Sequence, residues 1–160
     1  MKLLCDEMLK RLGRWLRAAG YDTVLDEDGT TDRELIERAQ REGRWLITRD
    51  AKLMEYRHAR QTVVLLLANS VEDCALELRH KLAIDWLYRP FSRCLECNAT
   101  LVVAAAQEDL ARVPREALAR GTEVFRCSGC QRLYWQGSHV RRMRAKLEKW
   151  AKISEMPKSL

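Results

Sequence analysis

The chain has 160 residues, of which 29 are Lys or Arg and 23 are Asp or Glu, so it can form one domain or two small ones but no large multi-domain assembly. With 47% hydrophobic residues, 32% charged residues and three prolines, the composition excludes a disordered or low-complexity protein. The longest apolar runs, residues 63–68 and 101–106, are far shorter than the roughly 20 residues that span a bilayer, which excludes a membrane protein.

The formal net charge of +6 lies entirely in the second half of the chain. Residues 1–90 hold 16 basic and 16 acidic side chains, whereas residues 91–160 hold 13 basic and 7 acidic ones. Within that half, residues 139–152 carry six Lys or Arg side chains against one Glu. Clustered cationic side chains bind polyanions by releasing counterions from phosphates, so this segment predicts contact with a nucleic acid. A solvated helix face is the alternative interpretation.

The N-terminus and the cysteines indicate the cellular compartment. The chain reaches Asp6 after three apolar residues, so we expect no secretory signal and a cytoplasmic protein. Four of the six cysteines form two Cys-x-x-Cys pairs, a spacing that in a reducing compartment favours a metal site over disulfides.

Strand and helix patterns alternate through the first half of the chain. Short apolar runs predict strands, and apolar residues at helical spacing predict the helices between them, the first of which ends at Gly20. Such alternation predicts an α/β fold with a mainly parallel sheet and helices on both faces. The expected strands are residues 2–5, 21–25, 45–48 and 62–69, and the expected helices follow Glu7, begin at Asp32 and follow the cap residue Ser70.

Three aspartates fall at or near the carboxyl ends of the predicted strands, where ligands bind in sheets of this type. Asp6 ends the first strand, Asp50 follows the third, and Asp32 opens the helix leading into the third, where it could also serve as an N-cap. Clustered carboxylates need protons or divalent cations to offset their repulsion, and oxygen ligands suit Mg²⁺ and Mn²⁺. Such ions activate water and neutralise phosphate charge, so these three residues predict the catalytic metal site of a nuclease.

Two Cys-x-x-Cys pairs separated by 29 residues are the most specific signal in the sequence. Each pair offers two thiolates, and four sulfur ligands complete a tetrahedral zinc, so the predicted zinc is structural and not catalytic. Three short strand patterns beside the pairs, with a helical insertion at residues 107–120, predict a zinc ribbon. Because this unit has few apolar residues, we expect chelation of zinc to unfold it. The predicted ligands are Cys94, Cys97, Cys127 and Cys130.

The basic C-terminal segment is also amphipathic. Val140, Met143, Leu147 and Trp150 recur at helical spacing and predict a helix with one apolar face. We therefore expect this helix to dock on the rest of the protein while its Lys and Arg side chains face solvent or RNA.

Several motifs resemble those of PIN-like ribonucleases. Residues 2–9 (KLLCDEML), 32–39 (DRELIERA) and 46–50 (LITRD) match in type and in order. The closer resemblance is to the Mut-seven C-terminal RNase domain family, which joins a compact PIN-like unit to a zinc ribbon. Its most specific parts here are residues 6–9, 11–17, 90–97 and 125–139. The resulting division is a PIN-like nuclease domain at 1–89, a zinc ribbon at 90–138, and a basic helix and tail at 139–160.

The resemblance implies a ribonuclease, acting as an endonuclease on single-stranded or structured RNA, in which the three aspartates bind Mg²⁺ or Mn²⁺. Larger PIN domains carry one more acid, for which Glu7, Glu34 and Asp73 are candidates here. Asp73 also fits a capping arrangement with Ser70. A protein inhibitor or a second copy of the chain are further possible partners.

Two groups of arginines are candidates for holding the RNA backbone. The first group is expected on the solvent side of the first helix and consists of Arg11, Arg14 and Arg17. The second group lies in the basic helix and consists of Arg141, Arg142 and Arg144. The main alternative function is a catalytically inactive RNA-binding or adaptor protein, suggested by the missing acid and by the neutral charge of residues 1–90. A phospho-receiver is disfavoured because the sheet lacks one strand-helix unit and because that design has no cysteine ribbon.

Overall fold

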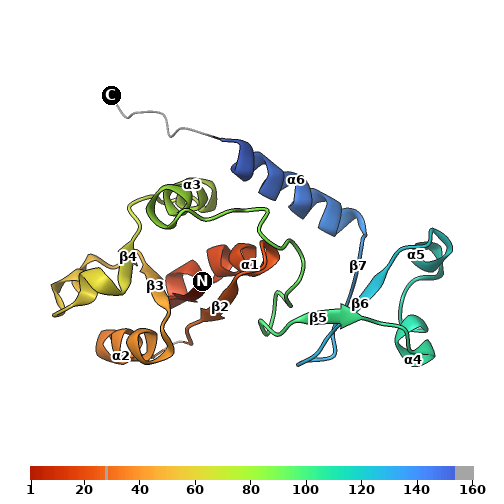
Figure 1. Cartoon of the computed structure of the whole chain (residues 1–160), viewed down its shortest axis with the longest axis horizontal. Coiled ribbons are helices and arrows are strands. Elements are labelled where there is room, and N and C mark those ends of the chain that lie inside the picture. Colours follow the sequence, from red (N-terminus) through yellow and green to blue (C-terminus); the bar gives the residue numbers. More distant parts are fainter. Residues whose placement is uncertain (28, 154–160) are drawn as a thin grey trace.

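The computed structural model describes residues 1–27 and 29–153. Its N-terminal part contains a four-stranded parallel sheet in the order β2-β1-β3-β4, with helices between the strands along the chain (Figure 1). The predicted parallel α/β architecture is therefore confirmed. The strands and α-helices of this part are β1 (Lys2–Cys5), α1 (Lys10–Ala18), β2 (Asp22–Leu25), α2 (Asp32–Glu42), β3 (Trp45–Thr48), β4 (Val63–Leu65) and α3 (Val71–Leu82). Its short 3-10 helices are η1 (Glu7–Leu9), η2 (Ala51–Glu55) and η3 (Ala59–Gln61).

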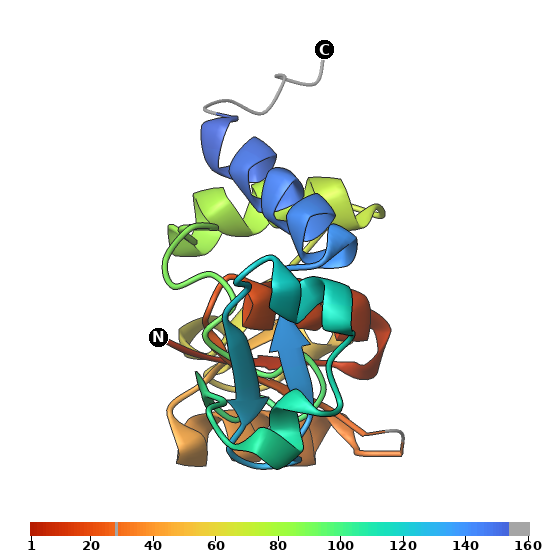
Figure 2. The ribbon, with the colours of Figure 1, turned by 90° about the vertical axis from the view of Figure 1, so that its right-hand side faces the viewer.

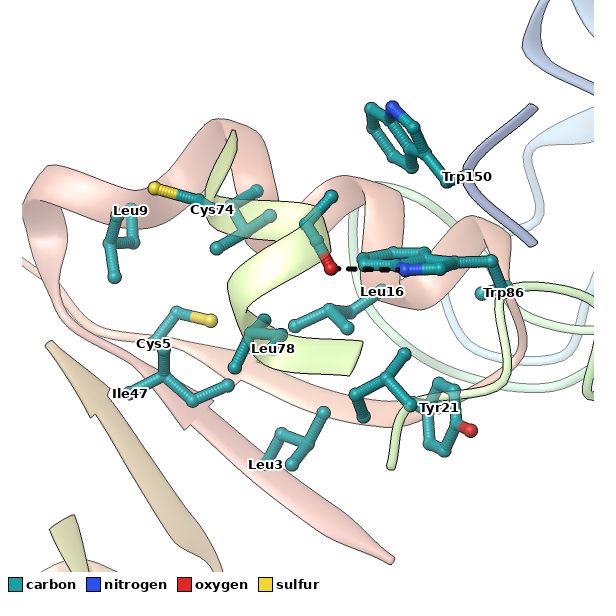
Figure 3. Packing of buried hydrophobic residues seen from close by; sticks show 14 of the residues in the cluster. Leu3, Cys5, Leu9, Leu16, Tyr21, Ile47, Cys74, Leu78, Trp86 and Trp150 are labelled. Carbon is teal, nitrogen blue, oxygen red and sulfur yellow. Dashed lines mark hydrogen bonds between the residues drawn. The ribbon is translucent and has the colours of Figure 1, made fainter. Parts of the chain in front are cut away.

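Both faces of the parallel sheet are buried. Successive residues of a strand point to opposite faces, so each strand contributes side chains to two cores. Leu3 and Cys5 of β1 pack with α1 and α3 in one core, which Figure 3 shows from close by. Leu4, between them, packs with Leu35 and Ile36 of α2 in a second core. Helices covering both faces explain why the strands read as continuous apolar runs.

The fourth strand is shorter than the sequence indicates. We expected a strand over residues 62–69, but β4 ends at Leu65. The backbone N–H groups of Leu67 and Ala68 instead donate to the carboxylate of Glu77 on α3, at 3.0 Å each. A side chain therefore takes the place of a neighbouring strand as the hydrogen-bond acceptor, and the chain leaves the sheet.

The C-terminal part contains a second sheet, which is antiparallel and ordered β5-β6-β7. Its own apolar core is small, with Ala104, Val113 and Val124 buried and Trp135 packed partly against them. The predicted helical insertion is present as two short helices interrupted at Pro114, which is the N-cap of the second. The elements are β5 (Leu101–Val103), α4 (Gln107–Leu110), α5 (Arg115–Ala119), β6 (Val124–Cys127) and β7 (Leu133–Trp135).

Helix α6 (Ser138–Lys152) leaves the antiparallel sheet and returns to lie beside α3 (Figures 1 and 2). Three of the four residues of its predicted apolar stripe, Met143, Leu147 and Trp150, are buried in the same core as α1 and α3, whereas Val140 is half-buried outside that core. The Trp150 ring meets those of Trp15 and Trp86 edge-on, with centroids 5.0 and 4.9 Å apart. The basic helix is thus fixed on the N-terminal part by aromatic packing.

The end of α6 is capped from α3. The guanidinium of Arg79 donates to the carbonyl oxygens of Trp150 and Ile153, at 2.9 and 3.0 Å. These carbonyl oxygens have no partner within the helix, and the guanidinium supplies their hydrogen-bond donors. Its positive charge also interacts favourably with the negative end of the helix dipole. The predicted division into 1–89, 90–138 and 139–160 stays a prediction, although α6 shares a core with the first of these segments. Residues 154–160 of the third lie outside the described residues.

No helix in the described part of the chain is long and apolar enough to cross a membrane.

A close backbone contact fixes the segment that leads from α3 to the antiparallel sheet. Gly20 ends α1 with a φ of +100°, and a Cβ added there would lie 2.3 Å from the carbonyl oxygen of Arg89. The N–H groups of Arg89 and Phe91 donate to the carbonyls of Ala19 and Ala18, at 2.9 and 2.8 Å. The segment therefore runs directly against the end of α1, and only glycine leaves room for it.

Replacing Gly20 by alanine tests this contact. We expect Gly20→Ala to lower the free energy of unfolding by about 3 kcal/mol, because left-handed backbone strain adds to a clash with backbone atoms. Gly43→Ala is the matched control, since Gly43 has a φ of +62° but no atom within 4 Å of the added Cβ. It should cost about 1 kcal/mol. Equal losses in urea denaturation of the two variants would contradict the contact.

Candidate functional site

Four aspartates line one hollow of about 260 Å³ at the carboxyl end of the parallel sheet. Asp6 follows β1, Asp26 follows β2, and Asp50 lies two residues beyond β3. Asp32, the first residue of α2, lines the same hollow. The three aspartates singled out in the sequence are therefore brought together, and Asp26 joins them.

Backbone pairing beyond the strand ends positions two of these acids. The N–H of Asp6 donates to the carbonyl of Ile47 at 3.1 Å, and the N–H of Asp26 donates to the carbonyl of Cys5 at 2.8 Å. Neighbouring strands lie about 4.8 Å apart, so Asp6 and Asp26 emerge side by side from β1 and β2. Their positions follow from the register of the sheet and not from a flexible loop.

Asp6 is the most buried acid of the hollow except for Asp26, with exposed fractions of 5% and 3%. Burial is the main cause that raises the pKa of Asp6, and the hydrogen bond from the Thr48 hydroxyl opposes that rise, as do the nearby backbone N–H groups of Arg49, Met8 and Leu9. This hydroxyl donates to Oδ2, whereas Oδ1 is buried without a hydrogen-bond partner. A buried oxygen without a partner is costly and calls for a bound ion or water.

The structural roles considered for Asp32 and Asp50 have different outcomes. Thr31, and not Asp32, caps α2, in a capping box with Glu34. The Asp50 carboxylate accepts from the N–H of Lys52 at 2.9 Å and so caps η2, while it also lines the hollow. Asp32 is therefore available for a ligand, and Asp50 combines a turn role with a place in the site.

Asp26 is an additional acid of the hollow, and the sequence analysis did not single it out. Of the residues considered for that place, only Glu7 lines the hollow. Glu34 is used in the capping box, and Asp73 accepts the Ser70 hydroxyl at 2.7 Å in the cap of α3, as its spacing predicted. The signal for Asp26 was its position directly after the second strand, the same criterion that identified Asp6.

The chemistry of the hollow suits a divalent cation. Among the described residues that line it there is no Lys or Arg, so the acids repel one another unless protons or cations neutralise them. The carboxylate oxygens of the hollow are spread more widely than the sulfurs of the cysteine site. Among the described residues, the four cysteines are the only group of three or more potential metal ligands whose ligand atoms all lie within 4.8 Å of one another. The acids that line the hollow are the four aspartates, Asp6, Asp26, Asp32 and Asp50, together with Glu7.

The four predicted zinc ligands do form one cluster. The sulfurs of Cys94 and Cys130 lie 3.6 Å apart, and those of Cys97 and Cys127 lie 3.3 Å apart. Four sulfurs at about 2.3 Å from a tetrahedral zinc would be separated by about 3.8 Å, close to these values. All six cysteines are free thiols, so the cluster is arranged for a metal and not for disulfides.

The surroundings of the cluster act in opposite directions on the thiols of Cys94 and Cys127. The Tyr134 hydroxyl lies 3.0 Å from the Cys94 sulfur and accepts from the N–H of Leu95 at 3.2 Å. Burial raises the pKa of Cys94, but hydrogen bonds from Tyr134 and backbone N–H groups outweigh it and lower the value to about 6. The N–H groups of Gly129 and Cys130 point to the sulfur of Cys127 at 3.3 and 3.4 Å, but burial outweighs them and raises the pKa of that thiol to about 12. Such donors orient metal ligands.

The expectation for Arg17 was wrong. It does not lie on the solvent side of α1 but is buried, with 4% exposure. Its Nε donates to the carbonyl of Thr23 on β2, and its Nη1 donates to the carbonyls of Leu95 and Glu96 in the first cysteine turn, at 2.7–2.8 Å. The cysteine turn covers the end of α1, so Arg17 links the parallel sheet to that turn and is not free to bind RNA.

The other arginines of α1 and those of α6 differ in exposure. Arg11 is exposed, and Arg14 makes a half-exposed ion pair with Glu96 at 3.4 Å. On α6, Arg141 and Arg142 are exposed, whereas the Arg144 guanidinium lies 5.1 Å from the centre of the Phe91 ring. These side chains remain candidates for RNA contacts.

Comparison with known families identifies the chain. The sequence matches the family model described as the Mut7-C RNAse domain over residues 1–147, which includes both sheets, the four cysteines and most of α6. The chain therefore belongs to this family, and the resemblance seen in its motifs is confirmed. Membership indicates a nuclease with RNA as its substrate. A search of curated proteins finds no match.

The role of Arg17 can be tested against that of Arg14. We expect Arg17→Met to lower the free energy of unfolding by about 3 kcal/mol, because it leaves buried carbonyl oxygens without donors. It should also speed the release of zinc to a chromogenic chelator, since it removes a positive charge beside the cysteine sulfurs. Arg14→Met should cost less than about 1 kcal/mol, as exposed ion pairs do. Similar urea-denaturation and zinc-release curves for the two variants would contradict the link.

Proposed function

We propose that this chain is a divalent-metal-dependent ribonuclease that hydrolyses RNA phosphodiester bonds as an endonuclease at the aspartate hollow. The observation that carries the proposal is the buried, unpartnered Oδ1 of Asp6 in a hollow lined by further acids. Such an oxygen is suited to a metal ion, and family membership makes RNA the substrate. A bound Mg²⁺ or Mn²⁺ would lower the pKa of a water and neutralise charge on the scissile phosphate.

Thr48 has a positioning role in this proposal. Its hydroxyl donates to Oδ2 of Asp6 and accepts from the N–H of Asp50 at 2.9 Å. One side chain therefore fixes the orientation of the Asp6 carboxylate and the start of the turn that carries Asp50. With Oδ2 engaged, Oδ1 is the oxygen left for the ion. Asp26 and Asp32 complete the ligand set from the neighbouring strand and from the start of α2.

The C-terminal part would hold the substrate. In the proposal the four cysteines bind a structural zinc, and the exposed face of α6 contacts RNA phosphates through Arg141, Arg142 and Arg144. Arg11 and Arg14 add positive charge on α1. The acidic hollow alone would repel RNA, so a separate cationic surface is needed to attract it. Reduced cysteines fit the cytoplasmic location that we also propose.

The alternative, an inactive RNA-binding or adaptor protein, depended on the absence of a further acid. Asp26 supplies an acid at that edge of the sheet, which favours the enzyme. The two functions differ in a simple observable, because an adaptor binds RNA without cleaving it.

Substitution of the buried acids tests catalysis. We expect Asp6→Asn and Asp26→Asn each to reduce manganese-dependent cleavage of RNA at least 100-fold, because each removes a charged oxygen ligand. Asp73→Asn is the matched control, since Asp73 accepts the hydroxyl of the N-cap residue Ser70 on α3 and does not line the hollow, and it should change the rate less than about threefold. A circular RNA as substrate tests the endonuclease mode, because it has no end for an exonuclease.

Two results would argue against this assignment. Unchanged cleavage by Asp6→Asn with zinc and fold intact would remove the hollow as the active site. Loss of activity in Asp26→Asn and Asp73→Asn alike would point to a general effect of the substitution and not to metal binding.

Salt dependence tests the role of α6. We expect replacement of Arg141 and Arg142 by Gln to flatten the plot of log binding constant against log salt by about 0.7 for each lost phosphate contact on single-stranded RNA. The control replaces Arg115 and Arg120, which lie at the two ends of α5, and should leave the slope unchanged. An unchanged slope in the α6 variant would place the RNA elsewhere.

A further inference from the structure

A second hollow, of about 140 Å³, lies where the antiparallel sheet, the segment before the first cysteine turn and the start of α6 meet. It shares no lining residue with the aspartate hollow. Four aromatic residues line it, Phe91, Phe125, Tyr134 and Trp135, the last of which also packs partly on the small core of the antiparallel sheet. The family match and the proposed catalytic site leave this hollow without a role.

The aromatic wall is rigidly held. Phe125 and Tyr134 are direct partners in the register of β6 and β7, so their side chains lie next to each other on one face of the sheet. The hydroxyl of Tyr134 is held by the Cys94 sulfur and the Leu95 N–H, which fixes its ring. The platform is therefore formed before any ligand arrives, and binding would cost little conformational entropy.

Cationic side chains border the same hollow. Arg93 and Arg144 line it, and the exposed Arg141 lies one turn before Arg144 on α6. The Nη1 of Arg93 donates to the carbonyl of Asn98 at 2.8 Å, so this side chain is held in place. Glu123 and Gln136 also line the hollow and offer hydrogen-bonding groups. Planar rings beside guanidinium groups are the usual features of a site for unpaired nucleotides.

We propose that this hollow binds one unpaired base of single-stranded RNA, with the adjoining phosphates on Arg141 and Arg144. An apolar cavity of about 150 Å³ holds one benzene-sized ring, so the volume suits a single base and not a larger ligand. The bordering guanidinium groups favour an anionic chain with planar rings over an apolar peptide. The identity of the ligand rests on the proposed function, but the binding site is separate from the aspartate hollow.

The test measures binding without cleavage. The full-length, zinc-loaded chain carrying Asp6→Asn serves as the parent, and the anisotropy of a fluorescein-labelled hexauridylate gives its affinity. We expect Phe125→Leu in this background to weaken binding about tenfold through loss of base stacking. An abasic ribose-phosphate chain of the same length should bind the parent and Phe125→Leu equally. Tyr88→Leu is the control, because Tyr88 is an exposed ring that stacks on Tyr21 outside the hollow.

Equal affinity of the parent and Phe125→Leu for hexauridylate would overturn the proposal. So would a loss of the same size on the abasic chain, which would indicate a structural effect. The Trp135 indole N–H resonance gives a second readout in the unsubstituted fold. It should shift with uridine monophosphate, and a shift only with N-acetylphenylalaninamide would make the hollow a site for a protein side chain. All of these measurements are independent of whether the aspartates catalyse hydrolysis.

Discussion

The buried guanidinium of Arg17 holds the first cysteine turn on the parallel sheet. Its hydrogen bonds go to carbonyl oxygens of β2 and of the first cysteine turn, and carbonyls do not neutralise its charge. Burial lowers the pKa of Arg17, whereas the nearby sulfurs of Cys94 and Cys97 oppose that shift. A zinc held there by four thiolates would carry a net charge of −2, so the metal site and the guanidinium would stabilise each other electrostatically. Packing of the cysteine turn on the parallel sheet would thereby be linked to the metal.

The parallel sheet imposes the second constraint, because it brings residues distant in sequence to one edge. Asp6, Asp26 and Asp50 come from three neighbouring strands, and continued pairing beyond the strand ends fixes the first two. Bringing acids together in this way is unfavourable without cations. This unfavourable arrangement occurs where the Thr48 hydroxyl binds one oxygen of the Asp6 carboxylate and the other oxygen has no partner. Stability given up at such an edge is typical of a functional site.

Much of this structure could be predicted from local patterns. The four cysteines, the alternating strands and helices, and the apolar stripe of α6 depend on spacing alone, and all are confirmed except for Val140 of the stripe. Asp26 was missed because it opens an acidic segment that looks like an ordinary loop. Arg17 was misplaced because the spacing of Arg11, Arg14 and Arg17 indicates one solvent face, and only the tertiary structure brings a cysteine turn over the end of that helix. Contacts between distant segments leave no periodic signal in either segment.

The docking of α6 determines which of its charges can reach RNA. Lys146 forms an ion pair with Glu72 and lies 5.3 Å from the ring centres of Trp15 and Trp150, so it belongs to the docked face. Arg141 and Arg142, near the start of the helix, remain exposed. Lys149 and Lys152 are also exposed, near the end of the helix, so docking leaves accessible positive charge at both ends of α6. The charge at the start of the helix adjoins Arg144 at the border of the aromatic hollow, and our proposal therefore places electrostatic capture of RNA and base stacking on one continuous surface.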